Sequence, residues 1–470
     1  MTFRRRPLFN KALEQSILER QYLASPFAQQ LSKSRRRPTK LDIFDFDSTL
    51  FLSPLLSPTI WHPALVNAVT TENLLGPGWW RDIRSLELGS KADLEKTAWN
   101  GYWNEDIVER ARKSLGDPDS LTVVLTGRRY HPFHRIIPDM LSAKQLNFDM
   151  VCLRPDPELA DMPDIHHRYN TQPSVFKSTM DFKNAFILHM LNVVPSLKTI
   201  NMWDDRLPHV KKFQAFLGKL KLASYKVYHV PAVRPRYNSS WEKQVVHCIL
   251  ETHNKAVLRY RAKTEDKACH HHNNRVRQSP NACLCCYQLS PVADTTIIAL
   301  SEEAIKQIRD VFDETYKKSI RRQDSKYPEW RRYAERPEFF GDRVILDTGV
   351  ISKNKVPLGG LGSRVKVKVV GMSQPSWVRG FALKVVVCPI SDDDQETYTK
   401  REYVLPLYYR PSSVQYAFRY NDWDWDRHAL DESKKLVVQG KVNYGYLLTA
   451  EPVHAVGKRA LPDDDTDCNK

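Results

Sequence analysis

Two carboxylates, two positions apart, follow a short apolar run early in the chain. The run is Leu41-Asp42-Ile43-Phe44, and Asp45-Phe46-Asp47 comes directly after it, followed by Ser48-Thr49. In a strand, residues i and i+2 share a face, so Asp45 and Asp47 are expected to point the same way. Neighbouring carboxylates repel each other unless a cation lies between them, and a divalent metal ion is the usual partner. The pattern indicates a metal site; a capped turn is the alternative.

Other polar residues that could join this chemistry lie at the ends of later elements. Thr126 ends the apolar run 121–125, and Asp204-Asp205 follow the run 199–203. Lys183 lies in the first turns of a helical pattern over residues 178–193. Because the carboxyl ends of parallel strands meet at one edge of an α/β sheet, where such sheets bind ligands, these side chains are expected to converge.

The elements that must position these residues alternate between strand and helix from residue 41 to about 230. Strands are predicted over residues 41–44, 121–126, 150–153, 199–203 and 226–230, and helices over 104–115, 178–193 and after residue 206. This alternation predicts a mostly parallel, doubly wound α/β sheet. Residues 52–120 contain no second strand and are rich in tryptophan, so they form an insert that acts as a lid or packs its own small core.

In this order, Asp45-x-Asp47-x-Thr49, Thr126, Lys183 and Asp204-Asp205 resemble the four motifs of the haloacid dehalogenase (HAD) superfamily of phosphatases. The runs DFDSTLF (45–51), VVLTGR (123–128) and WDDRxxH (203–209) more specifically resemble the HAD domain of Swiss Army Knife RNA repair proteins. The resemblance covers residues 38–260. It implies a HAD-like Rossmannoid parallel sheet with a cap inserted at about residues 52–120.

The resemblance also implies a catalytic role for each matched residue. Asp45 would be the nucleophile that forms an aspartyl-phosphate, and Asp47 the general acid and then base. Thr126 would hydrogen-bond a phosphoryl oxygen. Lys183 would balance negative charge in the transition state, and its position at the helix start favours it over Lys177, which also follows a phenylalanine.

The implied cofactor is Mg²⁺, an ion that prefers oxygen ligands. Its ligands would be Asp45, Asp204, Asp205 and the main-chain carbonyl of Asp47, with Asp205 acting directly or through water. Three flanking residues belong to the same motifs. Arg128 is expected to touch the phosphate or to pair with a surface acid, and Arg206 and His209 are expected to pair with the site aspartates.

Composition adds a strong positive charge. The 470 residues carry a formal charge of +16 with a pI near 9.3, which suggests a polyanionic partner such as nucleic acid. Residues 1–40 hold ten Lys or Arg against two Glu and are predicted to be a basic, disordered arm, with a nuclear or organellar signal as alternatives. Residues 461–470 are predicted to be an acidic tail.

A second domain is predicted after a polar linker. Residues 251–294 contain Cys269-His-His-His and Cys283-x-Cys285-Cys286, which suggest a structural zinc site or a solvated linker. Residues 295–460 are predicted to be an α+β domain, with a helix over 301–320 and strands over 343–346, 364–370, 380–388, 403–409 and 441–448. No pair of HxT or HxS motifs, which a 2H phosphodiesterase needs, occurs in it, so a binding module is expected.

The sequence has eight cysteines, no secretory h-region and no apolar run of 18 residues, which favours an intracellular compartment: cytoplasm, nucleus or mitochondrion. The resulting prediction is a Mg²⁺-dependent HAD phosphohydrolase that acts in RNA end processing or repair. Two alternatives stay open, a small-metabolite phosphatase and a noncatalytic RNA-binding protein on a HAD scaffold. The intact carboxylates argue against the second.

Overall fold

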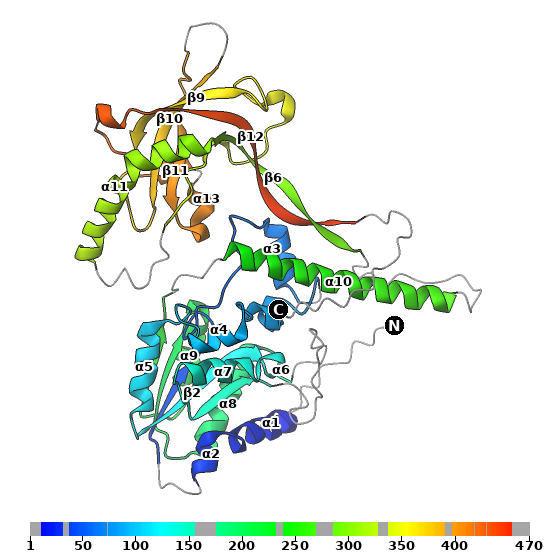
Figure 1. Cartoon of the computed structure of the whole chain (residues 1–470). Helices are drawn as coiled ribbons and strands as arrows, with labels where there is room; N and C mark the ends of the chain where they lie inside the picture. The colour runs from blue at the N-terminus through cyan, green and yellow to red at the C-terminus, as the bar shows by residue number, and fades with distance from the viewer. Residues whose placement is uncertain are drawn as a thin grey trace. The chain divides into compact units, whose positions relative to one another are not determined.

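The computed structural model divides the chain into two compact units, described separately here (Figure 1). One unit comprises residues 1–55, 67–288 and 452–470, and the other residues 56–66 and 289–451. The structure describes residues 11–31, 37–72, 74–155, 175–231, 238–268, 285–327, 337–390, 397–417, 419–428 and 430–453. No helix in these ranges is long and apolar enough to span a membrane.

The first unit is built on a parallel sheet of five strands in the order β3-β2-β1-β4-β5. The strands are β1 (Lys40–Phe44), β2 (Ser120–Arg129), β3 (Met150–Arg154), β4 (Thr199–Asp204) and β5 (Ser224–His229). All four neighbouring pairs of strands are parallel, with Phe44 of β1 opposite Val124 of β2 and Trp203 of β4. The predicted α/β parallel sheet is confirmed, and β1, which precedes Asp45, is its central strand.

Helices connect the strands. The segment between β1 and β2 holds α3 (Pro63–Thr70), η1 (Trp79–Arg81), η2 (Ile83–Ser85), α4 (Lys91–Lys96) and α5 (Glu105–Leu115). Later connections hold α6 (Tyr130–Phe133), α7 (Ile136–Ala143), α8 (Thr179–Val193), α9 (Leu207–Leu217) and α10 (Ser239–Ala268). Alternate strand residues such as Leu41, Ile43 and Met202 pack with α8 and α9 in one apolar core. On the opposite face, Ser114 of α5 donates a hydrogen bond to Asp42.

The predicted disorder of residues 1–40 is wrong for much of this segment. Residues 11–31 form α1 (Lys11–Leu23) and α2 (Pro26–Leu31). Helix α1 lies beside α8 (Figure 1). Ile17, Leu18 and Tyr22 of α1 are buried in the core of the sheet unit, and Glu19 lies 3.3 Å from His189 of α8. Burial of these apolar side chains stabilises the segment despite its charge. Residues 1–10 and 32–36 lie outside the described part.

The predicted irregular linker over residues 251–294 is shorter than expected. Helix α10 continues to Ala268, and strand β6 begins at Tyr287. Two of the four predicted zinc ligands, Cys269 and Cys283, lie outside the described residues, and Cys285 and Cys286 are free thiols. The zinc site therefore stays a prediction, and residues 461–470, the predicted acidic tail, also lie outside the described part.

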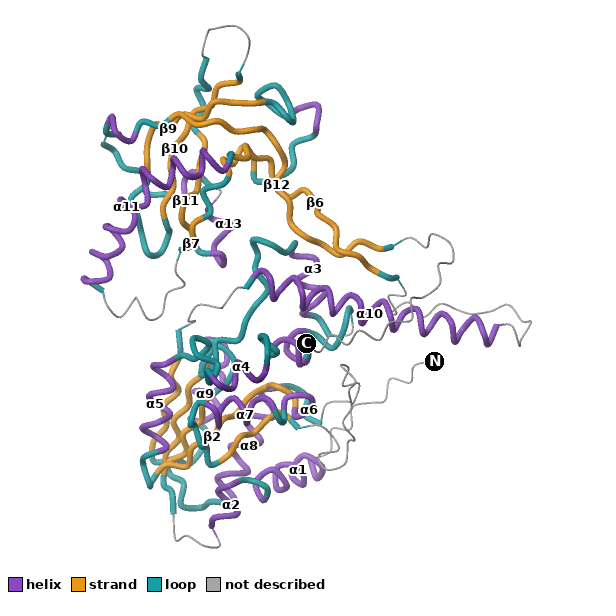
Figure 2. The backbone as a smooth tube through the Cα atoms, in the orientation of Figure 1, coloured by secondary structure: helices purple, strands orange, loops and turns teal. Residues whose placement is uncertain are grey.

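The second unit is an antiparallel sheet that closes on itself. Its strand order is β10-β9-β12-β6-β8-β11-β7, and β10 also pairs with β11, so six strands form a barrel. The strands are β6 (Tyr287–Leu300), β7 (Glu338–Phe339), β8 (Arg343–Asp347), β9 (Arg364–Met372), β10 (Phe381–Pro389), β11 (Tyr403–Tyr409) and β12 (Val437–Pro452). Figure 2 shows the long strands β6 and β12 running side by side. The C-terminal α+β domain predicted from the sequence is confirmed as a separate, antiparallel, strand-rich region.

The barrel has its own apolar core. Helix α11 (Glu302–Lys326) contributes Ile308, Phe312 and Tyr316, which are buried with the inward valines of β9 and β10. Short helical segments complete the unit: η3 (Lys353–Lys355), η4 (Pro411–Ser413), α13 (Val414–Ala417), η5 (Tyr420–Asp422) and η6 (Glu432–Lys434). The segment 56–66 also belongs here, because Ile60 and His62 form backbone hydrogen bonds of 2.8 and 2.9 Å with Leu448.

Candidate active site

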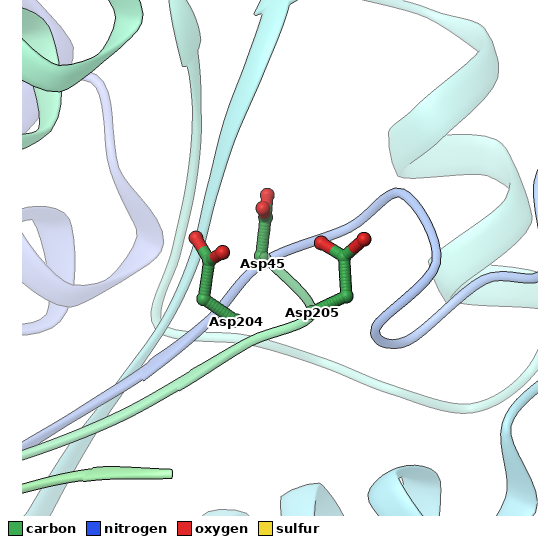
Figure 3. A group of neighbouring side chains, drawn as sticks. All are labelled: Asp45, Asp204 and Asp205. Atoms are coloured by element: carbon green, nitrogen blue, oxygen red, sulfur yellow. The ribbon is translucent and has the colours of Figure 1, made fainter. Parts of the chain in front are cut away.

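Three carboxylates meet where β1 and β4 end. Asp45 directly follows β1, Asp204 is the last residue of the neighbouring strand β4, and Asp205 comes next. Each offers an oxygen within 4.8 Å of the others, and Figure 3 shows Asp45 between the other two, with all three side chains on the same side of the backbone. The parallel register explains the meeting, because the amide of Asp45 donates to the carbonyl of Trp203 at 3.0 Å. Three of the predicted site residues are therefore neighbours.

Lys183 lies against two of these carboxylates. Its Nζ is 2.9 Å from Oδ2 of Asp45 and 3.1 Å from Oδ2 of Asp204, and the side chain is fully buried. The residue is in the second turn of α8, whose first turn is capped by Ser178, which accepts a hydrogen bond from the amide of Asp181 at 3.1 Å. Burial opposes the charge of Lys183, but Asp45 and Asp204 outweigh it and raise its pKa. Lys177, by contrast, is exposed.

The three aspartates are not equivalent electrostatically. Burial raises the pKa of Asp45 to about 7, an effect that Lys183 opposes and Asp204 reinforces. Burial and the charge of Asp204 likewise raise the pKa of Asp205 to about 6. Burial also opposes ionisation of Asp204, but His209, Lys183 and the Arg206 backbone outweigh it and lower its pKa. Asp45 and Asp205 thus resist ionisation beside the acidic Asp204, and a divalent cation would favour the ionised form of all three.

Asp47 departs from the expected geometry. The strand rule that predicted a common face for Asp45 and Asp47 does not apply, because β1 ends at Phe44 and residues 46–50 form a turn in which Ser48 has a φ of 56°. The carboxylate of Asp47 is not one of the three clustered groups. It instead accepts hydrogen bonds from Ser53 at 2.5 Å and from Nη2 of Arg128 at 2.8 Å.

Arg128 links Asp47 to the insert that follows β1. Its Nε lies 3.1 and 3.0 Å from the two oxygens of Asp47, and its Nη1 donates to Oγ of Ser85 in η2 at 2.6 Å. The guanidinium lies 5.0 Å from the ring centre of Trp80 and 4.6 Å from that of Phe133, and the side chain is only 1% exposed. Arg128 therefore pairs with an acid of the motif itself, Asp47, and not with a surface acid.

Thr126 is brought to the site by a close approach between β2 and α8. It is fully buried, and its Oγ1 accepts from the amide of Arg128 at 3.1 Å. A Cβ at the intervening Gly127 would lie 2.8 Å from Cγ2 of Thr179, so a side chain there would push the strand end away from the start of α8. Glycine at this position keeps the strand end that carries Thr126 packed against the helix that carries Lys183.

The two flanking residues of the WDDRxxH run lie beside the aspartates. The amide of Arg206 donates to Oδ1 of Asp204 at 3.0 Å, and its Nη2 is 3.9 Å from Oδ2 of Asp45. Nδ1 of His209 is 3.8 Å from Oδ2 of Asp204. Sequence reasoning missed Ser53 and Ser85, because a serine that contacts the site only through tertiary packing has no spacing that marks it.

Comparisons with known proteins agree with this geometry. Residues 53–255 match the sequence model of HAD domain family 1 in Swiss Army Knife RNA repair proteins. The chain is also similar to YMR265C, an uncharacterized protein of Saccharomyces cerevisiae, with 29% identity over 223 residues. That match covers 45% of the present chain and 44% of the relative, so the chain spans less than half of its length. No solved structure matches.

The matched range begins six residues after Asp47 and includes Thr126, Lys183 and both later aspartates. The parallel sheet with β1 at its centre, and the acidic edge where β1 and β4 end, agree with the match. Over residues 53–255, the sheet unit is therefore similar to the HAD domain of the family found in Swiss Army Knife RNA repair proteins.

Proposed function

We propose that the sheet unit is a Mg²⁺-dependent phosphohydrolase that works through an aspartyl-phosphate and acts on phosphorylated RNA ends. The observation that carries the proposal is the buried contact of Lys183 with both Asp45 and Asp204, beside Asp205. Phosphoryl transfer needs a positive charge beside its carboxylates, and here a buried lysine from a helix contacts two carboxylates at the ends of parallel strands.

The residues present fit the cofactor. The donors are carboxylate oxygens from Asp45, Asp204 and Asp205, with no nitrogen or sulfur ligand among them, and hard cations such as Mg²⁺ prefer such a set. We assign these three side chains, with the main-chain carbonyl of Asp47, as its ligands. When bound, the ion would withdraw negative charge from the phosphoryl oxygens.

The residues of the chain perform the bond changes. A carboxylate oxygen of Asp45 attacks phosphorus, the bond from phosphorus to the ester oxygen breaks, and Asp47 gives a proton to the leaving oxygen. Water then attacks the aspartyl-phosphate, Asp47 takes its proton, and inorganic phosphate and free Asp45 result. Lys183 and Thr126 contribute charge and a hydrogen bond to the phosphoryl oxygens in both steps.

Two observations support RNA ends as the substrate class. The matched family is described as a domain of RNA repair proteins, and the chain carries a charge of +16, which favours association with a polyanion. A small-metabolite phosphatase is the alternative, since the same bond changes apply to any phosphate monoester. Retention of all four carboxylates of the motifs disfavours a purely noncatalytic RNA-binding protein.

The test compares wild type and Asp45→Asn on RNA oligonucleotides with 3′- or 5′-terminal phosphates, free nucleotides and sugar phosphates, each with Mg²⁺ and with EDTA. We expect Mg²⁺-dependent phosphate release from RNA that Asp45→Asn abolishes. Asp93→Asn, on the exposed surface of α4, is the matched control and should retain activity. Equal inactivity of wild type and Asp45→Asn on all substrates would refute the enzyme, and activity on metabolites alone would refute the RNA substrate.

A further inference from the structure

Three aromatic side chains form a stack across the sheet beside the candidate active site. Phe44, Trp203 and Tyr228 are partners in the parallel register of β1, β4 and β5, so they lie on the same face. The rings of Phe44 and Trp203 are 4.4 Å apart and inclined by 2°, and those of Trp203 and Tyr228 are 5.0 Å apart and inclined by 10°. The rings are therefore nearly parallel.

The stack opens to solvent at its outer end. Phe44 is fully buried, Trp203 is 8% exposed and Tyr228 is 38% exposed. Strand β5 is the last strand of the sheet order, so the described part of this sheet places no further strand beyond Tyr228. A flat group of the right size could continue the stack on the outer face of the Tyr228 ring.

The stack lies next to the candidate site. Trp203 immediately precedes Asp204, and Tyr228 immediately precedes His229. Nε2 of His229 lies 3.0 Å from the main-chain oxygen of Asp205, so β5 is bonded to the segment that carries the clustered aspartates. Because side chains alternate along a strand, the stack lies on the face opposite Asp204, near the same carboxyl edge of the sheet. A substrate with its phosphate at those aspartates would reach the end of β5 by passing over that edge.

A positive charge lies on the same face. Lys226 is two residues before Tyr228 and is exposed, and its side chain is about 6.6 Å further back along the strand. Its register partner, Asn201, is held on this face by a hydrogen bond of 2.8 Å to Asp42. An aromatic face with a cation one strand repeat away is suited to a base and the phosphate that flanks it.

We propose that Tyr228 is a stacking platform for a nucleobase of the RNA substrate, with Lys226 beside a backbone phosphate. The inference rests on the proposed function, because it places a base next to the site that would hydrolyse the terminal phosphate. Stacking recognises any base and depends on no base-specific hydrogen bond, so the platform holds RNA ends of any sequence. It distinguishes a nucleic acid from a phosphate ester that has no base.

The test uses Tyr228→Ala and Tyr228→Phe, with Tyr225→Ala as the matched control. Tyr225 is in the same strand and is similarly exposed, at 40%, but points to the other face. The affinity for a short phosphorylated RNA is measured directly, by fluorescence anisotropy, on the Asp45→Asn background. Hydrolysis of that RNA and of glycerol phosphate, which has no base, is measured with the otherwise wild-type chain.

We expect Tyr228→Ala to weaken RNA affinity about tenfold, while Tyr228→Phe and Tyr225→Ala stay near wild type. Hydrolysis of glycerol phosphate should be unchanged in all three variants. Lys226→Ala should weaken affinity and lower the salt dependence by about one charge. Equal affinity of Tyr228→Ala and Tyr225→Ala, or no RNA binding at all, would overturn the platform. Failure to hydrolyse either substrate would refute the phosphatase instead, since binding is read independently.

Discussion

The chemistry of the site depends on how charge is balanced around one buried lysine. Lys183 contacts Asp45 and Asp204 but not Asp205, whose carboxyl group has a pKa raised by burial and by Asp204. The buried lysine thus contacts two of the three clustered carboxylates, and Arg206 lies further off, 3.9 Å from Asp45. The remaining negative charge is what a divalent ion would offset, and a phosphoryl group entering the site would need both cations.

Asp47 and Arg128 form a second ion pair, which bears on the proton that Asp47 would carry as a general acid. The ion pair is made with the ionised carboxylate, whereas a general acid must carry a proton. In the proposed mechanism, Arg128 would therefore yield part of its contact with Asp47 when substrate binds. A phosphate arriving beside Asp45 offers the guanidinium a competing anion of suitable geometry.

We predict that Arg128→Lys lowers kcat/KM at least tenfold. A lysine keeps the charge but cannot donate to Asp47 and Ser85 together through a planar fork, and each hydrogen bond to a charged group contributes about 1.5–3 kcal/mol. Ser85→Ala removes only the bond to η2 and serves as the comparison. The measurement is steady-state kinetics on a phosphate monoester, with circular dichroism as the folding control. Wild-type kinetics for Arg128→Lys would show that the fork geometry is irrelevant.

At the scale of elements, much of the sheet could be predicted because buried parallel strands are read as short apolar runs. Asp45 directly follows β1, Asp204 ends β4, and Thr126 lies in the carboxyl half of β2, three residues before its end at Arg129. The apolar runs therefore predict that these residues lie toward one edge of the sheet. The orientation of Asp47 could not be predicted, since it depends on a turn with a positive φ at Ser48 and on Arg128, 81 residues away.

Helix α1 was missed for a different reason. Its charge and the flanking basic runs are typical of a disordered arm, and its few apolar residues do not form a long regular stripe. The helix forms because it packs on the sheet unit: Ile17, Leu18 and Tyr22 are buried against the apolar core of that unit. Closure of the barrel by the β10–β11 pair, and the extension of α10 to Ala268, also follow from contacts that no local pattern encodes.

The packing of α1 against the sheet unit can be tested by substituting Ile17, which is fully buried. We predict that Ile17→Ala lowers the free energy of unfolding of the sheet unit by about 2–4 kcal/mol, because it removes buried apolar volume and leaves a cavity. Gln15→Ala, exposed on the same helix, should change it by less than about 0.5 kcal/mol. The measurement is denaturant unfolding followed by circular dichroism. Equal stability of the two variants would mean that α1 contributes nothing to the core.

At the scale of the whole molecule, the two units are not continuous stretches of the chain. Residues 56–66 begin fewer than ten positions after Asp47 of the DxD motif. They nevertheless belong to the barrel unit, together with residues 289–451. The predicted cap over residues 52–120 is therefore not one continuous piece: its first part pairs with β12, and later parts, such as Ser85 and Trp80, lie at Arg128. Residues 56–66 of the insert are thus part of the barrel unit.

This division predicts which strands lose stability when a residue of the insert is substituted. Trp61 is fully buried and pairs with Leu448 of β12, flanked by the backbone bonds of Ile60 and His62 to the same residue. Trp61→Ala should therefore lower the hydrogen-exchange protection of β12 around Leu448, by about 3–5 kcal/mol at most, while amides of β1 and β4 keep theirs. Leu74→Ala, exposed in the same insert, is the control and should leave β12 unchanged. If Trp61→Ala instead loosened β1 and β4 and spared β12, residues 56–66 would belong to the sheet unit, and the insert would be a single cap.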